Sequence, residues 1–127
     1  MLDGLHLIAS KDARYLALQG YKDRMTVNVR VDRIAIDDLW RGSEAPTTEQ
    51  RMAFICHNLD VIRVIAEKKL KCGDVEQEDW RGRTELGVHI RHADFDVYVN
   101  DANNRLSYVG FDPRARANWV GRNGYLF

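Results

Sequence analysis

The sequence predicts an α+β fold in which an antiparallel β-sheet of about four to six strands packs on one long α-helix at about residues 47–72. Three observations predict it: strict alternation of apolar and polar residues over 25–31, a helical period over 47–72, and short apolar runs flanking these segments. Since 127 residues suffice for one hydrophobic core, we expect residues 1–127 to form a single domain.

The first part of the chain contains three strand-like segments. Residues 5–9 and 13–18 are short apolar runs on either side of a Ser-Lys-Asp turn, and 25–31 follows a second turn at Gly20. In 25–31 every second residue is apolar, which is typical of a strand with one buried face and one wet face. We therefore expect an antiparallel meander, followed by a short helical turn at 34–40.

The helix at 47–72 has clear signals at both ends. Thr47 and Gln50 have the spacing of a capping box, in which each side chain accepts a hydrogen bond from the other residue's backbone N–H. At the other end, Gly73 can adopt the left-handed conformation that stops a helix, and lysines in the last turn favour the negative end of the helix dipole. These signals predict a single helix between the two ends.

The apolar face of this helix is unusually wide. Projected at 3.6 residues per turn, its apolar side chains cover an arc of about 180–200°, whereas a helix buried on one side needs little more than about 100°. We therefore expect the helix to be covered from two directions, by its own sheet and by either the C-terminal segment or a second subunit. The residues in the arc are Met52, Phe54, Ile55, Leu59, Val61, Ile62, Ile65, Ala66 and Leu70.

Asn58 lies in the middle of this apolar arc, between Ile62 and Ile65 in projection. A buried side-chain amide needs hydrogen-bond partners, because leaving it unpaired costs about 1–3 kcal/mol. We expect Asn58 to bond to the backbone of a sheet edge or a loop. The alternative is that it makes a polar contact in a ligand pocket or in a self-complementary interface.

The segment after the helix predicts an exposed loop and then a strand. Residues 74–85 are polar and charged, and Trp80 either pins this loop down or is exposed for contact. In 86–100 the apolar positions change parity, so we expect a strand with a bulge near Ala93. The Asp-Ala-Asn-Asn turn that follows predicts a hairpin over 96–111.

Composition argues against several classes of function. The 19 basic and 19 acidic side chains cancel, so no global charge favours nucleic acid, and neutrality permits self-association. No segment resembles a membrane span or a signal peptide. Cys56 and Cys72 are separated by about 24 Å of helix, beyond disulfide reach. We therefore expect reduced cysteines, no membrane and a cytoplasmic location, with Cys56 filling a gap in the core.

No group of residues has the pattern of a catalytic, metal or phosphate-binding site. His89 and His92 are three apart on a predicted strand, so they point to opposite faces and cannot share an ion. We interpret the adjacent carboxylates Asp37 and Asp38 as capping the short helical turn and facing solvent. We therefore predict no catalytic residue, no metal and no cofactor.

The C-terminal tail is a basic patch with interleaved aromatic residues. Its arginines could hold phosphates while the aromatic rings stack on bases, as in proteins that bind single-stranded nucleic acid. These arginines are few for such a site, so packing of the tail onto the domain is the favoured interpretation, and a subunit contact is a further alternative. The residues are Arg114, Arg116, Trp119, Arg122 and Tyr125.

The order of these segments, with particular residues in each, is shared with a known family. The residues are Val27, Val29, Val31, Asp37, Asp38, Leu39, Ala53, Phe54, His57, Asn58, Ile62, Ile65, Ala66, Lys68, Lys69, Val88, Ile90, Asp94 and Phe95. At these positions the chain resembles the family of small bacterial proteins classed as the domain of unknown function numbered fourteen-eighty-eight. The resemblance covers about residues 13–95 and implies a compact bacterial α+β domain with no established activity. Residues 96–127 form a C-terminal extension to this family-like core.

The function that these observations favour is a non-enzymatic binding or assembly module that self-associates as a homodimer. One alternative is nucleic-acid binding through the C-terminal tail. The other is a small-ligand or enzyme site near Asn58, lined also by Tyr15, His89 and Arg91. The contact residues of the favoured function would come from the wide helix face and the loop after it: Asn58, Phe54, Ile65 and Trp80.

Overall fold

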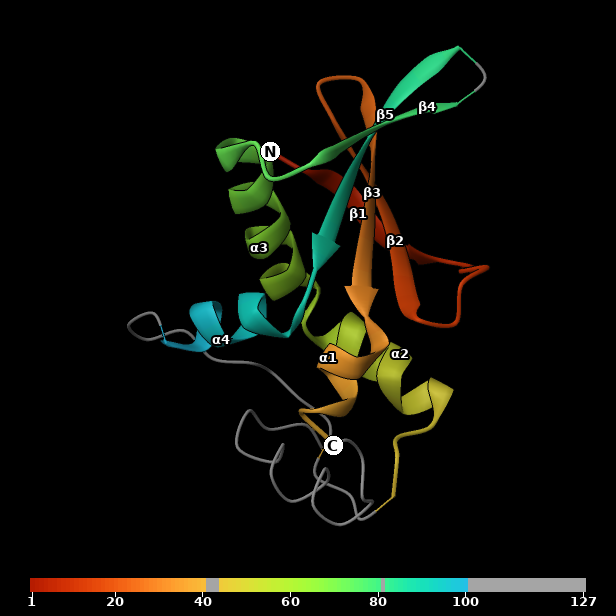
Figure 1. Cartoon of the computed structure of the whole chain (residues 1–127), viewed down its shortest axis with the longest axis vertical. Coiled ribbons are helices and arrows are strands. Elements are labelled where there is room, and N and C mark those ends of the chain that lie inside the picture. Colours follow the sequence, from red (N-terminus) through yellow and green to blue (C-terminus); the bar gives the residue numbers. More distant parts are fainter. Residues whose placement is uncertain (41–43, 81, 101–127) are drawn as a thin grey trace.

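The computed structural model describes residues 1–40, 44–80 and 82–100. This part of the chain has the predicted α+β fold, with a five-stranded sheet and four helices (Figure 1). The strands are β1 Asp3–Ile8, β2 Tyr15–Lys22, β3 Met25–Asp32, β4 Glu76–Trp80 and β5 Arg83–Ile90. The helices are α1 Arg33–Asp37, α2 Thr48–His57, α3 Leu59–Cys72 and α4 His92–Asn100.

The sheet is mixed, with the strand order β1-β2-β3-β5-β4. β1, β2 and β3 form the predicted antiparallel meander. β3 and β5 at the centre are parallel, with Val29 paired to Val88. The prediction of a purely antiparallel sheet is therefore wrong. The reason is that α3 returns the chain along the sheet, so the β4–β5 hairpin brings β5 back in the direction of β3 (Figure 1).

β3 has one buried face and one polar face, as its alternation predicts. Val27, Val29 and Val31 are 0% exposed and belong to the same apolar core as residues of the helices, whereas Asn28 and Arg30 between them are half-buried. α3 runs beside the sheet, and α1, α2 and α4 gather at the end where β3 and β5 finish (Figure 1). The core therefore lies between the valine face of the sheet and the helices.

Both predicted ends of the long helical segment are confirmed. The Thr47 hydroxyl accepts from the Gln50 N–H at 3.1 Å, and the Gln50 side chain accepts from the Thr47 N–H at 2.8 Å. Gly73 has a φ of 76°, so it ends α3 in the left-handed region that glycine enters without strain.

The prediction of one helix over 47–72 is wrong, because the segment breaks at Asn58 into α2 and α3. Asn58 has φ −115° and ψ 24°, outside the helical range. Its backbone N–H and its side-chain Nδ2 both donate to the Phe54 carbonyl, at 3.0 Å each. This competition by a short polar side chain explains why asparagine favours helix ends. Among the described residues no helix has the length and apolar character needed to cross a membrane.

A later segment of the same chain supplies the second cover of the wide helical face. Phe95 of α4 packs edge-on against Phe54 of α2, with ring centroids 5.9 Å apart, and both side chains are buried. Ile62 and Ile65 of α3 are buried as well. Met52 belongs to the arc but is 45% exposed. The chain therefore covers most of the arc and leaves one end of it open.

The segment after α3 contains a strand where the sequence predicts an exposed loop. β4 pairs antiparallel with β5, with Glu76 opposite Gly87 and Trp80 opposite Arg83. β4 is an edge strand, and charged side chains on such a strand discourage pairing with other chains. The polar composition of 74–85, which indicates a loop, is therefore equally typical of an edge strand that avoids pairing with other chains.

Residues 86–100 are the end of β5 followed by α4, where the sequence predicts one bulged strand. The change of parity near Ala93 is the change from the period of a strand to the period of a helix, which brings Phe95 into the core. The predicted hairpin over 96–111 is wrong where α4 replaces it, and its remainder lies outside the described residues.

Candidate functional site

Asn58 lies where α2 meets α3 and is 1% exposed. Its Nδ2 donates to the Phe54 carbonyl, and its Oδ1 makes no hydrogen bond to the described part of the chain. The prediction that Asn58 bonds to a sheet edge or a loop is therefore wrong, since its partner is the last turn of α2. At this exposure Asn58 stabilises the break between two helices and offers almost no surface to a ligand.

The other predicted contact residues of the helix are covered by their own chain or lie outside the described residues. Phe54 is 0% exposed and Ile65 is 6% exposed. The side chain of Trp80 is outside the described part of the structure. So are the residues of the basic tail: Arg114, Arg116, Trp119, Arg122 and Tyr125.

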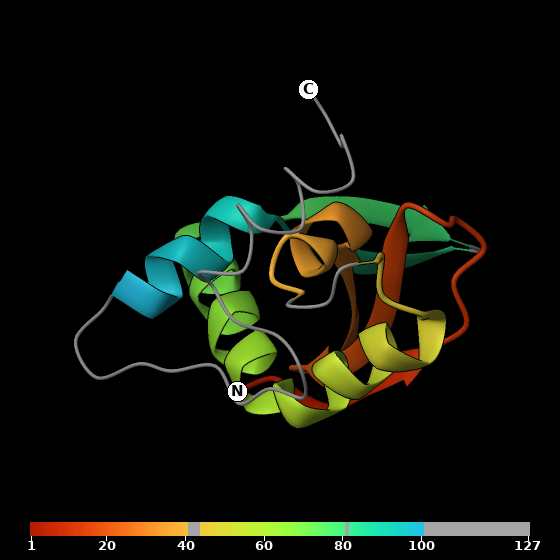
Figure 2. The same cartoon turned by 90° about the horizontal axis from the view of Figure 1, so that it is seen from below.

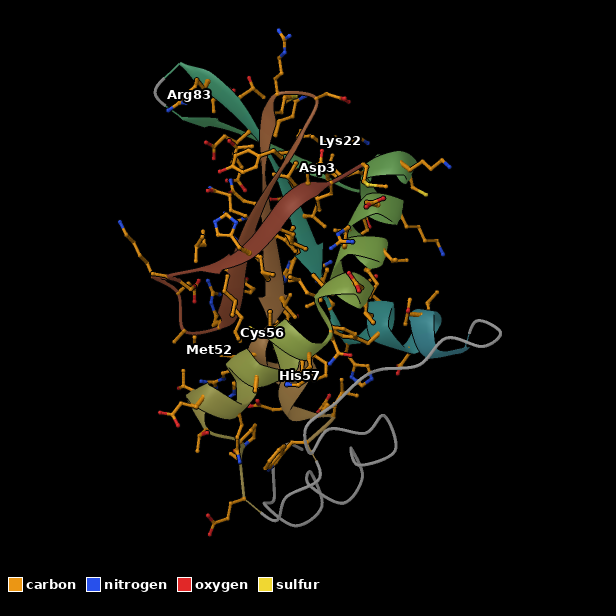
Figure 3. All side chains as sticks on the ribbon, turned by 180° about the vertical axis from the view of Figure 1, so that it is seen from behind. Asp3, Lys22, Met52, Cys56, His57 and Arg83 are labelled. Carbon is orange, nitrogen blue, oxygen red and sulfur yellow. The ribbon has the colours of Figure 1, made fainter. Side chains whose placement is uncertain are left out.

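The last turn of α2 presents Cys56 and His57 to solvent (Figure 3). The prediction that Cys56 fills a gap in the core is therefore wrong, because α2 buries Phe54 and Ile55 and leaves Cys56, the next residue, on its exposed side. Cys72 at the end of α3 is exposed too, and both thiols are free. Within the described residues, neither thiol makes a hydrogen bond to a basic group that would favour the reactive thiolate.

The adjacent carboxylates Asp37 and Asp38 are buried, where the sequence predicts that they face solvent. Asp37 accepts two hydrogen bonds from Arg51 of α2, at 2.7 and 3.0 Å. Asp38 Oδ2 lies 2.9 Å from Nδ1 of His92 in α4. Figure 2 shows α1 between α2 and α4. The two carboxylates therefore tie α1 to both of its helical neighbours.

The sheet face opposite the buried valines carries hydrogen-bonded polar side chains, and we call it the polar face. Gln19 Nε2 donates to Asn28 Oδ1 at 3.1 Å, and Asn28 Nδ2 donates to Glu85 Oε1 at 2.8 Å. These three side chains come from three neighbouring strands, and Gln19 is directly opposite Asn28, whereas Gly87 and not Glu85 is opposite Asn28 on β5. The members of the polar face are Gln19, Asn28, Arg30, Asp32, Glu78, Glu85 and His89.

An ion pair on the polar face lies over Gly87. Arg30 donates to the two oxygens of Glu78 at 2.7 and 3.2 Å, and this bond raises the pKa of Arg30 although partial burial opposes the shift. A Cβ at position 87 would lie 2.4 Å from Glu78 Oε1. Glycine therefore leaves the space that the ion pair occupies.

His89, Asp32 and Tyr15 meet at the end of the polar face where β3 and β5 finish. His89 Nε2 lies 2.5 Å from Asp32 Oδ1, and the Tyr15 ring meets the imidazole edge-on with centroids 5.0 Å apart. Register explains the cluster, because Tyr15 is opposite Asp32 and His89 is opposite Arg30. An ionised Asp32 can only accept, so Nε2 carries a proton, and in the neutral imidazole Nδ1 then has the free lone pair.

Of the residues predicted to line a ligand site near Asn58, the structure brings two together. Tyr15 and His89 line one cavity, whereas Asn58 is buried among the helices and Arg91 is exposed after β5. His89 and His92 pair with different carboxylates. Within the described ranges no three His, Cys, Asp or Glu side chains are placed to hold a metal ion.

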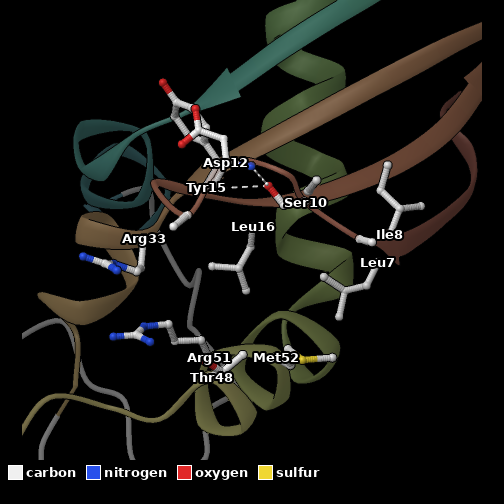
Figure 4. Close-up of a pocket in the computed structure, with 13 residues that line it drawn as sticks. Leu7, Ile8, Ser10, Asp12, Tyr15, Leu16, Arg33, Thr48, Arg51 and Met52 are labelled. Atoms are coloured by element: carbon white, nitrogen blue, oxygen red, sulfur yellow. Dashed lines mark hydrogen bonds between the residues drawn. The ribbon is translucent and has the colours of Figure 1, made fainter.

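An apolar groove of about 500 Å³ lies between the β1–β2 loop and α2 (Figure 4). Ile8 and Met52 on this groove are 36% and 45% exposed. Figure 4 shows Arg33 and Arg51 together at one side of it. Its main apolar lining residues are Leu7, Ile8, Ala9, Ala13, Leu16, Ala17 and Met52.

Sequence reasoning missed Asp32 and Arg33 as site residues. Asp32 ends a strand, and side chains at the carboxyl ends of parallel strands often form ligand sites. That signal is visible only when β3 and β5 are known to be parallel, which the prediction of an antiparallel sheet excluded.

Comparison of the chain with protein-family models, with curated proteins and with solved structures found no match. The resemblance of residues 13–95 to the bacterial family therefore stays a prediction.

Proposed function

We propose that the chain is a non-enzymatic binding module that self-associates through the apolar groove between the β1–β2 loop and α2. The observation that carries the proposal is the pair of exposed apolar side chains on the groove, Ile8 and Met52, beside about 500 Å³ of open apolar space. Single exposed apolar residues are ordinary on a protein surface, but a group of them around a concave apolar surface favours a protein contact.

A second copy of the chain suits this groove. The β1–β2 loop carries Lys11, and the first turn of α2 carries Glu49, both of which are exposed. A two-fold axis at the groove would place the loop of one copy over α2 of the other, so that these opposite charges meet while Ile8 and Met52 pack between them. The formal net charge of zero adds no long-range repulsion.

The proposed interface lies at the open end of the helical arc and not at its centre. Phe54 and Ile65, which the sequence suggests as contacts, are already buried against their own chain. Met52 belongs to the same arc and remains available. The surplus apolar surface is therefore smaller than the sequence indicates, and it lies at the start of α2.

Sedimentation equilibrium of the full chain at micromolar concentration tests the proposal. We expect a dimer for the wild-type chain and at least about tenfold weaker dimerisation for Met52→Glu, because a carboxylate buried in an apolar contact loses its hydration. Val64→Glu is the matched control, since Val64 is 53% exposed on α3 and does not line the groove.

Two results would contradict the proposal. One is a wild-type chain that stays monomeric across the whole concentration range. The other is a dimer that survives Met52→Glu and dissociates in Val64→Glu, which would place the interface on α3. Circular dichroism of each variant shows that a change in mass is not caused by unfolding.

A further inference from the structure

A second cavity, of about 260 Å³, opens where the polar face meets α1. It is lined by residues of β2, β3, β5 and α1, together with Arg14 from the turn before β2. Sites for drug-sized molecules are about 300–1,000 Å³, so this cavity has the size for a small ion or for the head group of a larger ligand. Its lining residues are Arg14, Tyr15, Asp32, Arg33, Ile34 and His89.

Arg33 differs from the other arginines of this region, because its guanidinium makes no hydrogen bond to the described residues. Its Nε lies 3.9 Å from an oxygen of Asp37, whose carboxylate is already bonded to Arg51. Arg14 and Arg30, by contrast, use their guanidinium groups on Asp12 and Glu78. Arg33 is therefore a cation at the cavity with unused donors.

Tyr15 and His89 add two more unused groups. The Tyr15 hydroxyl and His89 Nδ1 make no hydrogen bond within the described ranges. His89 is held in place by Asp32 at Nε2, and the edge-on contact with Tyr15 fixes the two rings relative to each other. In the neutral imidazole with Nε2 protonated, Nδ1 accepts hydrogen bonds.

The position of the cavity fits a ligand site. Asp32 is the last residue of β3 and His89 is the last but one of β5, and these two strands are parallel. Open sheets place ligands at the carboxyl ends of their parallel strands, because neighbouring chain segments diverge there. Asp12 already engages Arg14, and His89 already engages Asp32, whereas the Arg33 guanidinium keeps unused donors at the cavity, and a negative ligand could accept from them.

We propose that this cavity binds a small oxyanion that also carries a hydroxyl group, such as a phosphate monoanion or a 2-hydroxycarboxylate. Arg33 and Tyr15 both line the cavity, so the guanidinium and the hydroxyl would donate to the anionic oxygens, and a planar guanidinium is suited to an oxyanion. His89 Nδ1 accepts from the ligand hydroxyl. The site does not depend on self-association, although Arg33 and Tyr15 also border the apolar groove.

NMR titration of the full chain, observed at the histidine ring signals, tests the site. The probes are inorganic phosphate, glycolate and acetate, each added at constant ionic strength so that general screening does not change. We expect saturable shifts of the His89 ring with phosphate and glycolate, and several-fold weaker binding of acetate, which lacks the hydroxyl. His6 and His57 are exposed away from this cavity and serve as internal controls.

Three variants assign the roles. Arg33→Gln should weaken all three probes at least about tenfold, because a charge-assisted bond is lost. Tyr15→Phe keeps the ring contact with His89 and should weaken them several-fold. Arg83→Gln is the matched control, since Arg83 is exposed at the far end of β5, close to the tip of the β4–β5 hairpin (Figure 3).

The outcomes that overturn the site are specific. Shifts that grow without saturating would show that the anion does not bind at a specific site. Equal affinity in Arg33→Gln and in the wild-type chain would show that Arg33 does not contact the anion. Equal affinity for glycolate and acetate would show that the ligand hydroxyl does not bond to His89. If phosphate binds and glycolate does not, the ligand is a phosphate, and the reverse result assigns a carboxylate. Melting curves confirm that each variant is folded, so a lost signal reports binding.

Discussion

The two faces of β3 are built differently, although their residues alternate along one strand. On one face three valines are 0% exposed and pack into a single apolar core with the helices. On the other face Asn28 and Arg30 are half-buried and bond to side chains of β2, β4 and β5. One face is closed by packing, and the other is connected by hydrogen bonds.

This difference separates stability from binding. Full burial of an apolar side chain contributes about 1.5–3 kcal/mol, whereas an exposed ion pair contributes about 0–1 kcal/mol. The Arg30 and Glu78 side chains are 38% and 30% exposed, which places their ion pair near the weaker class. The polar face can therefore change with little loss of stability, and a binding site placed there does not compete with folding.

The largest effect is expected where the covered face is opened. Phe54→Ala removes a fully buried ring that packs on Phe95, so it should lower the free energy of unfolding by about 3–5 kcal/mol. Val64→Ala is the control, because Val64 is 53% exposed and its change should stay within about 0.5 kcal/mol. Urea denaturation measures both. Equal losses of unfolding free energy in the two variants would show that the buried contact of Phe54 with Phe95 does not stabilise the core more than a surface residue does.

A smaller effect is expected on the polar face. Gly87→Ala places a methyl group 2.4 Å from Glu78 Oε1, so it should displace the carboxylate from Arg30 and cost about 1 kcal/mol at most. In a Glu78→Ala background the same substitution should be neutral or stabilising, because alanine restricts the unfolded chain more than glycine does.

The double-mutant cycle over Gly87 and Glu78 measures this coupling by chemical denaturation, and we expect about 0.5–1 kcal/mol. A coupling of zero would mean that the ion pair adapts to the methyl group without loss. In that case the ion pair of Arg30 and Glu78 would contribute even less to the free energy of unfolding than the exposure of its side chains indicates.

The smallest effect concerns the surface ion pair of Asp12 and Arg14, next to Tyr15. A side-chain hydrogen bond from Arg14, helped by the Arg14 backbone N–H, lowers the pKa of Asp12 from its ordinary value of 3.8 to about 2. A lowered pKa means that the pair stabilises the folded chain above pH 3.8 and that this contribution is lost as the pH falls towards 2.

Comparison of Asp12→Asn with the wild-type chain checks the direction. The wild-type chain should be slightly more stable at neutral pH, and the difference should vanish as the pH falls through that window. Denaturation at a series of pH values measures it, with salt added in a parallel series because an exposed pair is screened. A difference that grows in acid would contradict the shift.

The parts of the fold that the sequence predicts correctly are those set by neighbouring residues. The alternation of β3 and the capping box of Thr47 and Gln50 each depend on contacts within a few positions, so periodicity and spacing are enough to find them. The helix break is also local, but it depends on whether the Asn58 side chain bonds to the Phe54 carbonyl one turn earlier or to a distant segment, and both choices fit the same sequence.

The candidate sites could be predicted only in part, because they depend on contacts between distant segments. Tyr15 and His89 are identifiable as polar residues of strands, yet only the pairing of β2 with β3 and of β3 with β5 brings them together. Arg33 becomes a site residue because Arg51, from another helix, occupies Asp37. No spacing within one segment indicates that competition.

The parallel pairing at the centre of the sheet also has a consequence for synthesis. The β1–β3 meander can form once residues up to 32 are free to fold, but β3 gains its second neighbour only after β5 has followed. Closing such a long loop is slow compared with forming a hairpin. On the ribosome β3 is therefore an apolar edge that can pair with other nascent chains, and chains that stop before residue 83 keep that edge and should aggregate.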